Sequence, residues 1–134
     1  MNYDQLKYKH QVKQRRKPSN HESQLQIDCV KWFKMQYRQY AGCFFSVPNG
    51  GQRNAITAKR LKAEGAMAGV SDLILLIPNE HFNGLCIEMK YEKGKQSEHQ
   101  VKFEKNVTHW GYKYVVCRTI EGFCKEVNEY LKDA

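Results

Sequence analysis

Two short apolar runs joined by a turn-rich segment constrain the fold of this chain most strongly. They lie in GVSDLILLIPNEHFNGLCIEMK, residues 69–90. Proline, asparagine and glycine between the runs predict a hairpin, so we expect two neighbouring antiparallel strands. Charged residues mark one end of each strand: Asp72 opens the first, and Glu88 and Lys90 close the second. Buried strands disfavour charges, so these three residues need a physical reason to be there.

The expected pairing of the two strands brings these charges together. A hairpin centred near His81 places Asp72 opposite Lys90 and Ile74 opposite Glu88. Because side chains alternate between the faces of a sheet, both acids and the lysine then share one face, while the apolar residues between them pack in the core. Two close carboxylates repel each other, and partial burial adds a desolvation cost, so we expect a cation between them. Mg²⁺ suits such a site, since it takes carboxylate, water and phosphate oxygens.

An ordinary alternative is that these charges only end their strands and form a surface pair. Two other polar residues favour a site instead. Glu22 completes SNHE (19–22) and fits a capping box, but it also lies on the apolar stripe of its helix and would point inward. Gln100 completes SEHQ (97–100) and has the same ambiguity, because it too lies on an apolar stripe. Both residues therefore have a capping role and a site role open to them.

The rest of the chain predicts alternating helices and strands. Apolar spacing and turn residues indicate a helix from Ser19 or Asn20 to about Tyr40, a strand over 43–47, a helix over 55–65, the hairpin strands, a helix over 98–110, a strand over 112–117 and a last helix with Phe123, Val127 and Leu131. This order is typical of an α/β fold in which helices flank a mixed central sheet.

Length and charge define one folded domain with a basic arm. The 134 residues suit a single domain, and 22 Lys plus Arg against 14 Asp plus Glu give a net charge of +8. Residues 1–18 hold most of this excess, so we divide the chain into a basic N-terminal arm, 1–18, and a domain, 19–134. The arm is either a solvated tail or a phosphate clamp. The excess favours a nucleic-acid partner over an anionic membrane.

Cysteine and apolar patterns exclude several classes of protein. The five cysteines include no C-x-x-C pair, which argues against a disulfide framework or zinc knuckle. The five histidines show no ligand pairing, which disfavours a histidine-metal nuclease. No run approaches the roughly 18 apolar residues that span a bilayer, and the N-terminus has no apolar signal region. We therefore expect a cytoplasmic protein with no membrane partner.

A glycine-rich loop and the basic helix after it are candidates for phosphate contact. Glycine amides and basic side chains both bind phosphate oxygens. The ordinary alternative is a turn followed by a solvated helix face. The candidate nucleic-acid-binding residues are Asn49, Gly50, Gly51, Arg53, Lys59 and Arg60.

Several motifs in a fixed order resemble one family. GVSDLILL, IEMK and GKQSEHQ, together with PNGGQRN and a leading helix that carries Glu22, resemble the virus-type replication-repair nuclease (VRR-NUC) domain of the PD-(D/E)XK superfamily. The resemblance covers roughly residues 20–118. Ser71 stands where the family usually has proline, a difference that removes no metal ligand. The resemblance implies a restriction-endonuclease-like fold with an αβββαβ core.

The resemblance also implies a role for each site residue. Asp72, Glu88 and the backbone carbonyl of Met89 would bind Mg²⁺ or Mn²⁺, and Glu22 would reach the metal or its waters. Lys90 would act at the attacking water or the phosphate, and Gln100 would support the site. The implied activity is a Mg²⁺-dependent endodeoxyribonuclease. Standalone relatives suggest a homodimer that acts on branched DNA such as four-way junctions.

Other functions remain as alternatives. A non-catalytic nucleic-acid-binding module would explain the net charge and the arm, but it leaves Asp72, Glu88 and Glu22 unexplained, because acids repel phosphate unless a metal intervenes. A nucleotide-handling enzyme is disfavoured, since EKGK (92–95) lacks the context of a phosphate loop. A purely structural or interaction protein is the remaining class.

Overall fold

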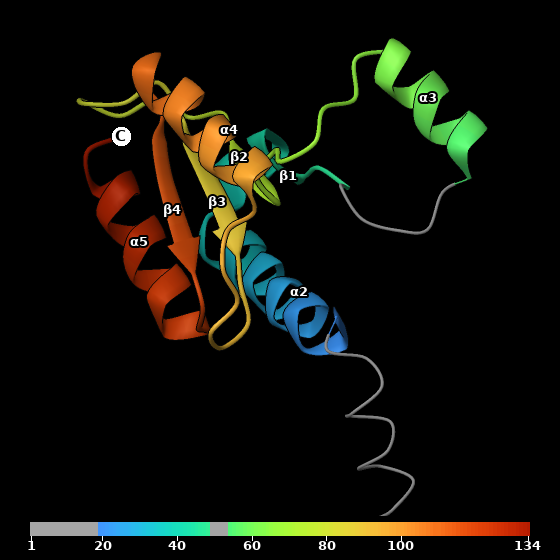
Figure 1. Ribbon diagram of the computed structural model, residues 1–134. Helices are drawn as coiled ribbons and strands as arrows, with labels where there is room; N and C mark the ends of the chain where they lie inside the picture. Colours follow the sequence, from blue (N-terminus) through green and yellow to red (C-terminus); the bar gives the residue numbers. More distant parts are fainter. Residues whose placement is uncertain (1–18, 49–53) are drawn as a thin grey trace, which may run out of the picture.

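The computed structural model describes residues 19–48 and 54–134, and Figure 1 shows its arrangement. The expected order of helices and strands is confirmed, with one 3₁₀ helix added. The elements are α2 (Ser19–Gln36), η1 (Arg38–Cys43), β1 (Phe44–Ser46), α3 (Ala55–Ala63), β2 (Leu73–Leu75), β3 (Leu85–Met89), α4 (Glu98–His109), β4 (Lys113–Cys117) and α5 (Ile120–Lys132). The basic arm and the glycine-rich loop lie outside the described residues.

The four strands form one mixed sheet in the order β1-β2-β3-β4. β1 pairs antiparallel with β2, and β2 pairs antiparallel with β3. β4 lies parallel to β3, and α4 makes the crossover between them. A parallel pair needs such a crossover, because a tight turn cannot return the chain to the same end of the sheet. The α/β fold with a mixed sheet is therefore confirmed.

The hairpin register differs from the expected one. Leu73 pairs with Ile87 and Leu75 with Leu85. The centre of the hairpin is therefore Glu80 and not His81. The expected pairing of Asp72 with Lys90 was thus wrong by two residues. A shift of two leaves the facing of each side chain unchanged, because the pleat repeats every two residues. Continued beyond the end of β2, the observed register sets Asp72 level with Glu88.

The main core lies between the sheet and the helices α2 and α5. Its buried members are Cys29 and Phe33 from α2, Phe44, Leu73, Leu75, Leu85, Ile87, Met89 and Cys117 from the sheet, and Phe123, Val127, Tyr130 and Leu131 from α5. α4 covers the opposite face, where the Phe103 ring packs edge-on against Tyr114 of β4 at 6.3 Å between centroids. All five residues of β3 are buried, since helices cover both faces of this strand.

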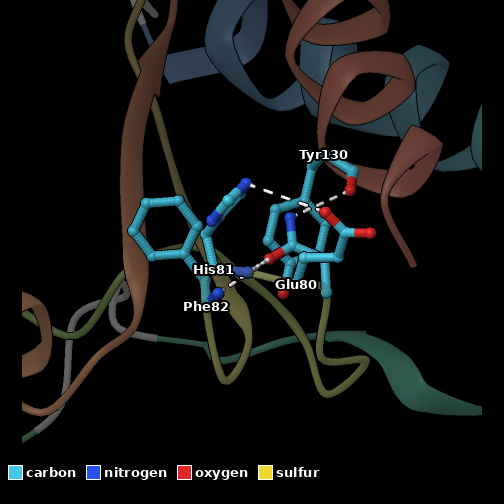
Figure 2. Close-up of polar contacts among 5 residues, drawn as sticks. Glu80, His81, Phe82 and Tyr130 are labelled. Carbon is cyan, nitrogen blue, oxygen red and sulfur yellow. Dashed lines mark hydrogen bonds and ion pairs between the residues drawn. The ribbon is translucent and has the colours of Figure 1, made fainter.

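The loop between β2 and β3 is fixed to the end of α5. The Asn79 side-chain oxygen accepts hydrogen bonds from the backbone N–H groups of His81, at 2.9 Å, and Phe82, at 2.7 Å. Its amide nitrogen donates to the Tyr130 carbonyl oxygen at 3.0 Å. Figure 2 shows this arrangement around Glu80 and His81. The loop joins the C-terminal end of β2 to the N-terminal end of β3. Asp72 and Met89 lie at the other ends of these two strands, so His81 is remote from the acids.

α2 ends earlier than its sequence suggests. The expected helix reaches about Tyr40, but the chain leaves the α-helical conformation at Tyr37, where φ is −127° and ψ is 62°. The 3₁₀ helix η1 then brings the chain to β1. The Tyr37 ring packs against both Trp32 and Phe33, so apolar contact continues through this change in helix type.

Candidate active site

The sheet brings Asp72 and the end of β3 into direct contact. An Asp72 carboxylate oxygen, Oδ2, accepts a hydrogen bond of 2.7 Å from the backbone N–H of Met89. This contact occupies the position just beyond β2, where the backbone ladder between the two strands has ended. The Asp72 side chain thus replaces a backbone acceptor and is held beside Glu88, the preceding residue of β3.

Glu88 is a buried carboxylate with a donor on each oxygen. Its side chain is almost fully enclosed, with 1% of the residue exposed. Gln100 Nε2 donates to Oε1 at 2.9 Å, and the Tyr114 hydroxyl donates to Oε2 at 3.1 Å. Each carboxylate oxygen has two lone pairs, so one on each remains for another ligand. The two donors, from α4 and β4, therefore orient the carboxylate without using up its capacity.

Gln100 both caps α4 and contacts Glu88. It completes a capping box with Ser97 at the start of α4. The Ser97 N–H donates to Gln100 Oε1 at 2.8 Å, so the amide oxygen must face the helix end. The amide nitrogen then faces Glu88, where only a donor is useful to a carboxylate. The helix cap fixes the orientation of this site residue.

Burial and a neighbouring acid raise the pKa of Glu88. Loss of solvation is the largest cause, followed by a hydrogen bond that the protonated Glu88 carboxyl donates to Asp72 and by electrostatic repulsion between the two carboxylates. The Tyr114 hydroxyl and the Lys90 ammonium act in the opposite direction and lower the pKa. The Glu88 carboxyl thus holds a proton to a higher pH than an ordinary glutamate, because its negative charge is poorly compensated.

Glu22 approaches the same acids from α2. Partial burial raises its pKa most, and the negative charge of Asp72 raises it further. Lys90 and a hydrogen bond from the Tyr91 backbone N–H lower it. The His21 ring stacks on Tyr91 at 5.0 Å between centroids, which fixes the first turns of α2 against the chain that follows β3. Glu22 lines the same cleft as Asp72, and its role at the acid pair stays a prediction.

Lys90 lies where its charge reaches both Glu22 and Glu88. It follows β3 and is half-buried. The turn after it is held by Arg118, whose Nη1 donates to the carbonyl oxygens of Glu92 and Gly94, both at 2.7 Å. This contact fixes the path of the chain on which Lys90 stands.

The donor chemistry of the three acids fits a hard divalent cation. Glu22, Asp72 and Glu88 offer only oxygen ligands, which Mg²⁺ and Mn²⁺ prefer. Within residues 19–48 and 54–134, no group of three or more His, Cys, Asp and Glu side chains is close enough to hold a metal ion as it stands. Mg²⁺ commonly uses only one or two carboxylates and completes its shell with waters and phosphate. The adjacent Asp72 and Glu88 meet that lesser requirement.

Of the six expected DNA-binding residues, the structure describes Lys59 and Arg60. Asn49, Gly50, Gly51 and Arg53 lie outside the described residues. Lys59 and Arg60 are exposed on α3, which stands apart from the sheet in Figure 1. The Arg60 Nε atom lies 3.8 Å from a carboxylate oxygen of Glu64 on the same helix. An exposed pair of this kind is weak and leaves the arginine available for other partners.

The sequence interpretation missed Tyr114 and the residue behind it, Gln96. Gln96 Nε2 donates to the Tyr114 oxygen at 3.3 Å and to Glu104 Oε1 at 3.1 Å. Burial is the largest cause that raises the Tyr114 pKa, so its hydroxyl keeps the proton that it donates to Glu88. The available signal was the alternation in YKYVVC, which puts one face of β4 against α4. Nothing in the sequence specified that this face would meet Glu88.

The mixed sheet, with two acids and a lysine at the ends of β2 and β3 away from their connecting loop, defines the class of PD-(D/E)XK nucleases. A family model, the VRR-NUC domain, matches residues 20–120, and the chain belongs to this family of nucleases. A solved structure described as a VRR_NUC domain protein has a similar fold, with a TM-score of 0.74 and 24% identity. The match covers 84% of this chain and 89% of that one.

Among curated proteins, none matches this chain. In the part of the chain that the structure describes, the helices are all too short or too polar to cross a membrane.

Proposed function

We propose that this chain is a metal-dependent DNA endonuclease that hydrolyses phosphodiester bonds. The observation that carries this proposal is the pairing of Asp72 with buried Glu88, beside Lys90. A fully buried glutamate next to an aspartate is costly for a purely structural protein. It becomes favourable when a cation neutralises the two charges. The nuclease family of the chain supports DNA as the substrate.

Mg²⁺ or Mn²⁺ would be held by Asp72, Glu88 and the backbone carbonyl of Met89, with Glu22 reaching the metal or its waters. The chemistry that such an ion supplies when bound is a lower pKa for its water and neutralisation of charge on the phosphate. Gln100 and Tyr114 keep the Glu88 carboxylate oriented. The Met89 N–H keeps Asp72 beside it.

Lys90 is the group of this chain that acts on the reacting atoms. Its charge acts on the nearby carboxyl groups of Glu22 and Glu88. A protonated lysine donates to a non-bridging oxygen of the phosphate and stabilises the charge that develops there. Its positive charge also favours hydroxide at the attacking water. Lys90 is therefore an electrostatic stabiliser rather than a proton acceptor.

A panel of labelled DNAs tests this function directly. Duplex, flap, single-stranded and four-way DNA are incubated with the chain in Mg²⁺, Mn²⁺ or EDTA. Cleavage within the labelled strands that requires the divalent ion is the expected result. The panel also tests the proposed preference for branched DNA. Binding in EDTA without cleavage in either metal would reject catalysis.

A non-catalytic nucleic-acid-binding module is the second candidate. It is favoured by the net charge of +8 and by the lack of a preformed three-residue metal group within residues 19–48 and 54–134. It does not account for the burial of Glu88. The two candidates separate in the same panel, because only the nuclease changes the length of the DNA.

We further propose that the chain acts as a homodimer. One site cuts one strand, so paired cuts in a four-way junction require two sites, which a two-fold dimer provides. Large apolar residues remain exposed at Met35, Leu76 and Trp110 and are available for an interface. Light scattering should give the mass of two chains at micromolar concentration. A monomer that cuts junction and plain duplex equally would contradict both the dimer and the junction preference.

A further inference from the structure

α2 presents a second stripe of side chains beside the one that enters the core. The core stripe includes the buried residues Cys29 and Phe33. The second stripe consists of Ser23, Gln26, Ile27, Val30, Lys31 and Lys34, which recur at helical spacing and line a cleft. Ile27 on this stripe is 44% exposed. An exposed isoleucine between polar residues and two lysines indicates a surface for a partner that is both apolar and anionic.

The other wall of the cleft is the edge strand of the sheet. Among the strands of residues 19–48 and 54–134, β1 pairs with β2 alone, and its residues Phe44 to Ser46 line the cleft together with Val47 and Pro48. Phe45 is 43% exposed. The cleft has a volume of about 870 Å³, and both Glu22 and Asp72 line it. A ligand that lies along this cleft is therefore continuous with the candidate active site.

Resting on the proposed nuclease function, we propose that the cleft holds one unpaired DNA strand next to the scissile phosphate. Lys31 and Lys34 lie one helical turn apart and neutralise its phosphates. Phe45 and Ile27 offer an apolar surface to a base. Only an unpaired strand can use that surface, because the base faces of a duplex are already stacked on one another. Aromatic stacking combined with a basic groove is the usual way to bind single strands.

The test measures affinity in EDTA, where no cleavage occurs. Fluorescence anisotropy follows the binding of a labelled oligothymidine to the full chain at several salt concentrations. The double variant Lys31→Gln/Lys34→Gln should lower the salt slope by about 1.4, since each phosphate contact on a single strand contributes about 0.7. Phe45→Thr should weaken binding by about tenfold, whereas Phe45→Tyr keeps the ring and the affinity.

The matched control removes the same charge elsewhere. Lys125→Gln/Lys132→Gln changes two exposed lysines of α5, outside the cleft, and should leave the slope nearly unchanged. Equal slopes for the two double variants would overturn the proposal. So would a Phe45→Thr chain that changes from dimer to monomer in light scattering, because a second copy would then occupy the cleft. Normal cleft binding without metal-dependent cleavage would reject the nuclease function alone.

A separate inference comes from the hydrogen bonds behind Glu88. A carboxylate only accepts, so the Gln96 amide nitrogen must face Glu104, and the same nitrogen lies 3.3 Å from the Tyr114 oxygen. The Tyr114 oxygen therefore accepts from Gln96. Its single proton is left for Glu88 Oε2. The network runs in one direction, from Gln96 through Tyr114 to Glu88.

We infer that Tyr114 is a positioning residue for the proposed metal ligand Glu88. It touches neither substrate nor metal and acts by keeping the carboxylate in one orientation and favouring its ionised form. Residues behind a metal ligand typically change metal affinity 10- to 100-fold when they are removed. Gln96 supports Tyr114 in turn by fixing the direction of its hydroxyl.

Calorimetric titration of Mn²⁺ into the DNA-free chain tests this role without using activity. Tyr114→Phe should weaken Mn²⁺ affinity by about 10- to 100-fold. Tyr130→Phe is the matched control, because the Tyr130 hydroxyl donates to the Ile77 carbonyl, away from the acids. It should lower the melting temperature and leave Mn²⁺ affinity unchanged.

Gln96→Leu is a second variant that leaves Tyr114 in place, and it should show a smaller loss of Mn²⁺ affinity. Unchanged affinity in both Tyr114→Phe and Gln96→Leu would overturn the positioning role. If Tyr114→Phe does not fold, Gln96→Leu decides the question alone. Mn²⁺ binding by the wild type without DNA cleavage would reject the nuclease function and leave this inference standing.

Discussion

At the residue scale, the burial of Glu88 is the feature that most needs an energetic explanation. Its charge lies beside that of Asp72, and it is compensated by two hydrogen bonds and by Lys90. Ionising Glu88 costs more free energy in the folded chain than in the unfolded chain, where the carboxylate is solvated. Without a cation, the site should therefore lower stability at neutral pH. Function and stability compete at this residue.

The first prediction is that Glu88→Gln stabilises the metal-free chain as pH rises. Glutamine stays neutral, and its amide oxygen can still accept the hydrogen bond from Gln100. The folded-state pKa of Glu88 is raised, so its favourable contribution is complete below its ordinary value of 4.5 and is lost as pH rises through the raised value. Within that window the variant should gain up to about 1.4 kcal/mol per pH unit. Urea unfolding in EDTA across this range measures the difference.

Added Mg²⁺ should reverse this order. The ion neutralises the acid pair and stabilises the wild type, while Glu88→Gln loses a ligand and responds less. A free energy of unfolding that falls with pH equally in both chains would contradict the assignment to Glu88. The same series with Asp28→Asn, an exposed acid of α2, controls for general charge effects.

The second prediction concerns cleavage by the proposed site. Asp72→Asn and Lys90→Ala should each reduce cleavage by about a hundredfold or more, because the first weakens the proposed metal site and the second removes a positive charge that stabilises the transition state. Binding of DNA in EDTA should persist, since neither residue is needed to hold the backbone. Single-turnover cleavage and anisotropy measure the two effects. Undiminished cleavage by both variants would remove these residues from the mechanism.

At the scale of elements, the start of α4 is fixed by a glycine far away in the sequence. Gly69 has φ of +85°, and a side chain there would come within 2.4 Å of the His99 backbone carbonyl. His99 belongs to the first turn of α4 and precedes Gln100. The segment before Asp72 thus packs directly under the helix that carries the Glu88 donor. Close contact between these two segments sets the distance between the acid pair and Gln100.

The third prediction is that Gly69→Ala disturbs both stability and activity. The backbone strain and the clash should together cost about 1–3 kcal/mol of unfolding free energy, and the shift of α4 should weaken cleavage. Two matched glycines separate the causes. Gly65→Ala introduces backbone strain at a φ of +106° but no clash, because nothing lies within 4 Å of the added Cβ. Gly42→Ala introduces neither strain nor a clash. Thermal melts should rank the loss as Gly69, then Gly65, then Gly42, and equal losses would contradict the clash.

The facing of the acids was predictable, but their pairing was not. Side chains alternate between the two faces of a strand because of the pleat. Asp72 and Glu88 therefore share a face in the expected pairing and in any pairing that differs from it by two residues. The observed register depends on the loop that joins the strands, where Asn79 is bound to Tyr130 at the end of α5. That contact joins residues far apart in the chain. Local patterns carry no information about it.

The capping boxes show a related limit. SEHQ correctly predicted the start of α4, because a cap depends only on neighbouring residues. The hydrogen bond from Gln100 to Glu88 depends on where the crossover places α4 over the sheet. Tyr114 was missed for the same reason, since its partner lies on the neighbouring parallel strand. Site residues on single elements can be read from sequence, whereas the groups behind them require the fold.

At the scale of the whole molecule, positive charge is divided unequally between the arm and the domain. Residues 1–18 include Lys7, Lys9, Lys13, Arg15, Arg16 and Lys17 against Asp4 alone. They contain none of the proposed catalytic residues. The acids of the site repel phosphate until a cation binds, so an attractive segment elsewhere would raise the affinity for DNA. Such a segment contributes to binding and not to the chemical step.

The last prediction follows from this separation of charge and chemistry. Deleting residues 1–18 should weaken duplex binding at low salt and reduce the salt slope by about 0.9 for each phosphate that the arm neutralises. The single-turnover cleavage rate at saturating protein should stay unchanged, because the acids and Lys90 remain. Replacing the six basic residues by glutamine in the full-length chain controls for loss of length and should reproduce the deletion. A deletion that leaves the slope unaltered would show that the arm does not bind phosphate, and one that lowers the saturated rate would give the arm a place in the active site.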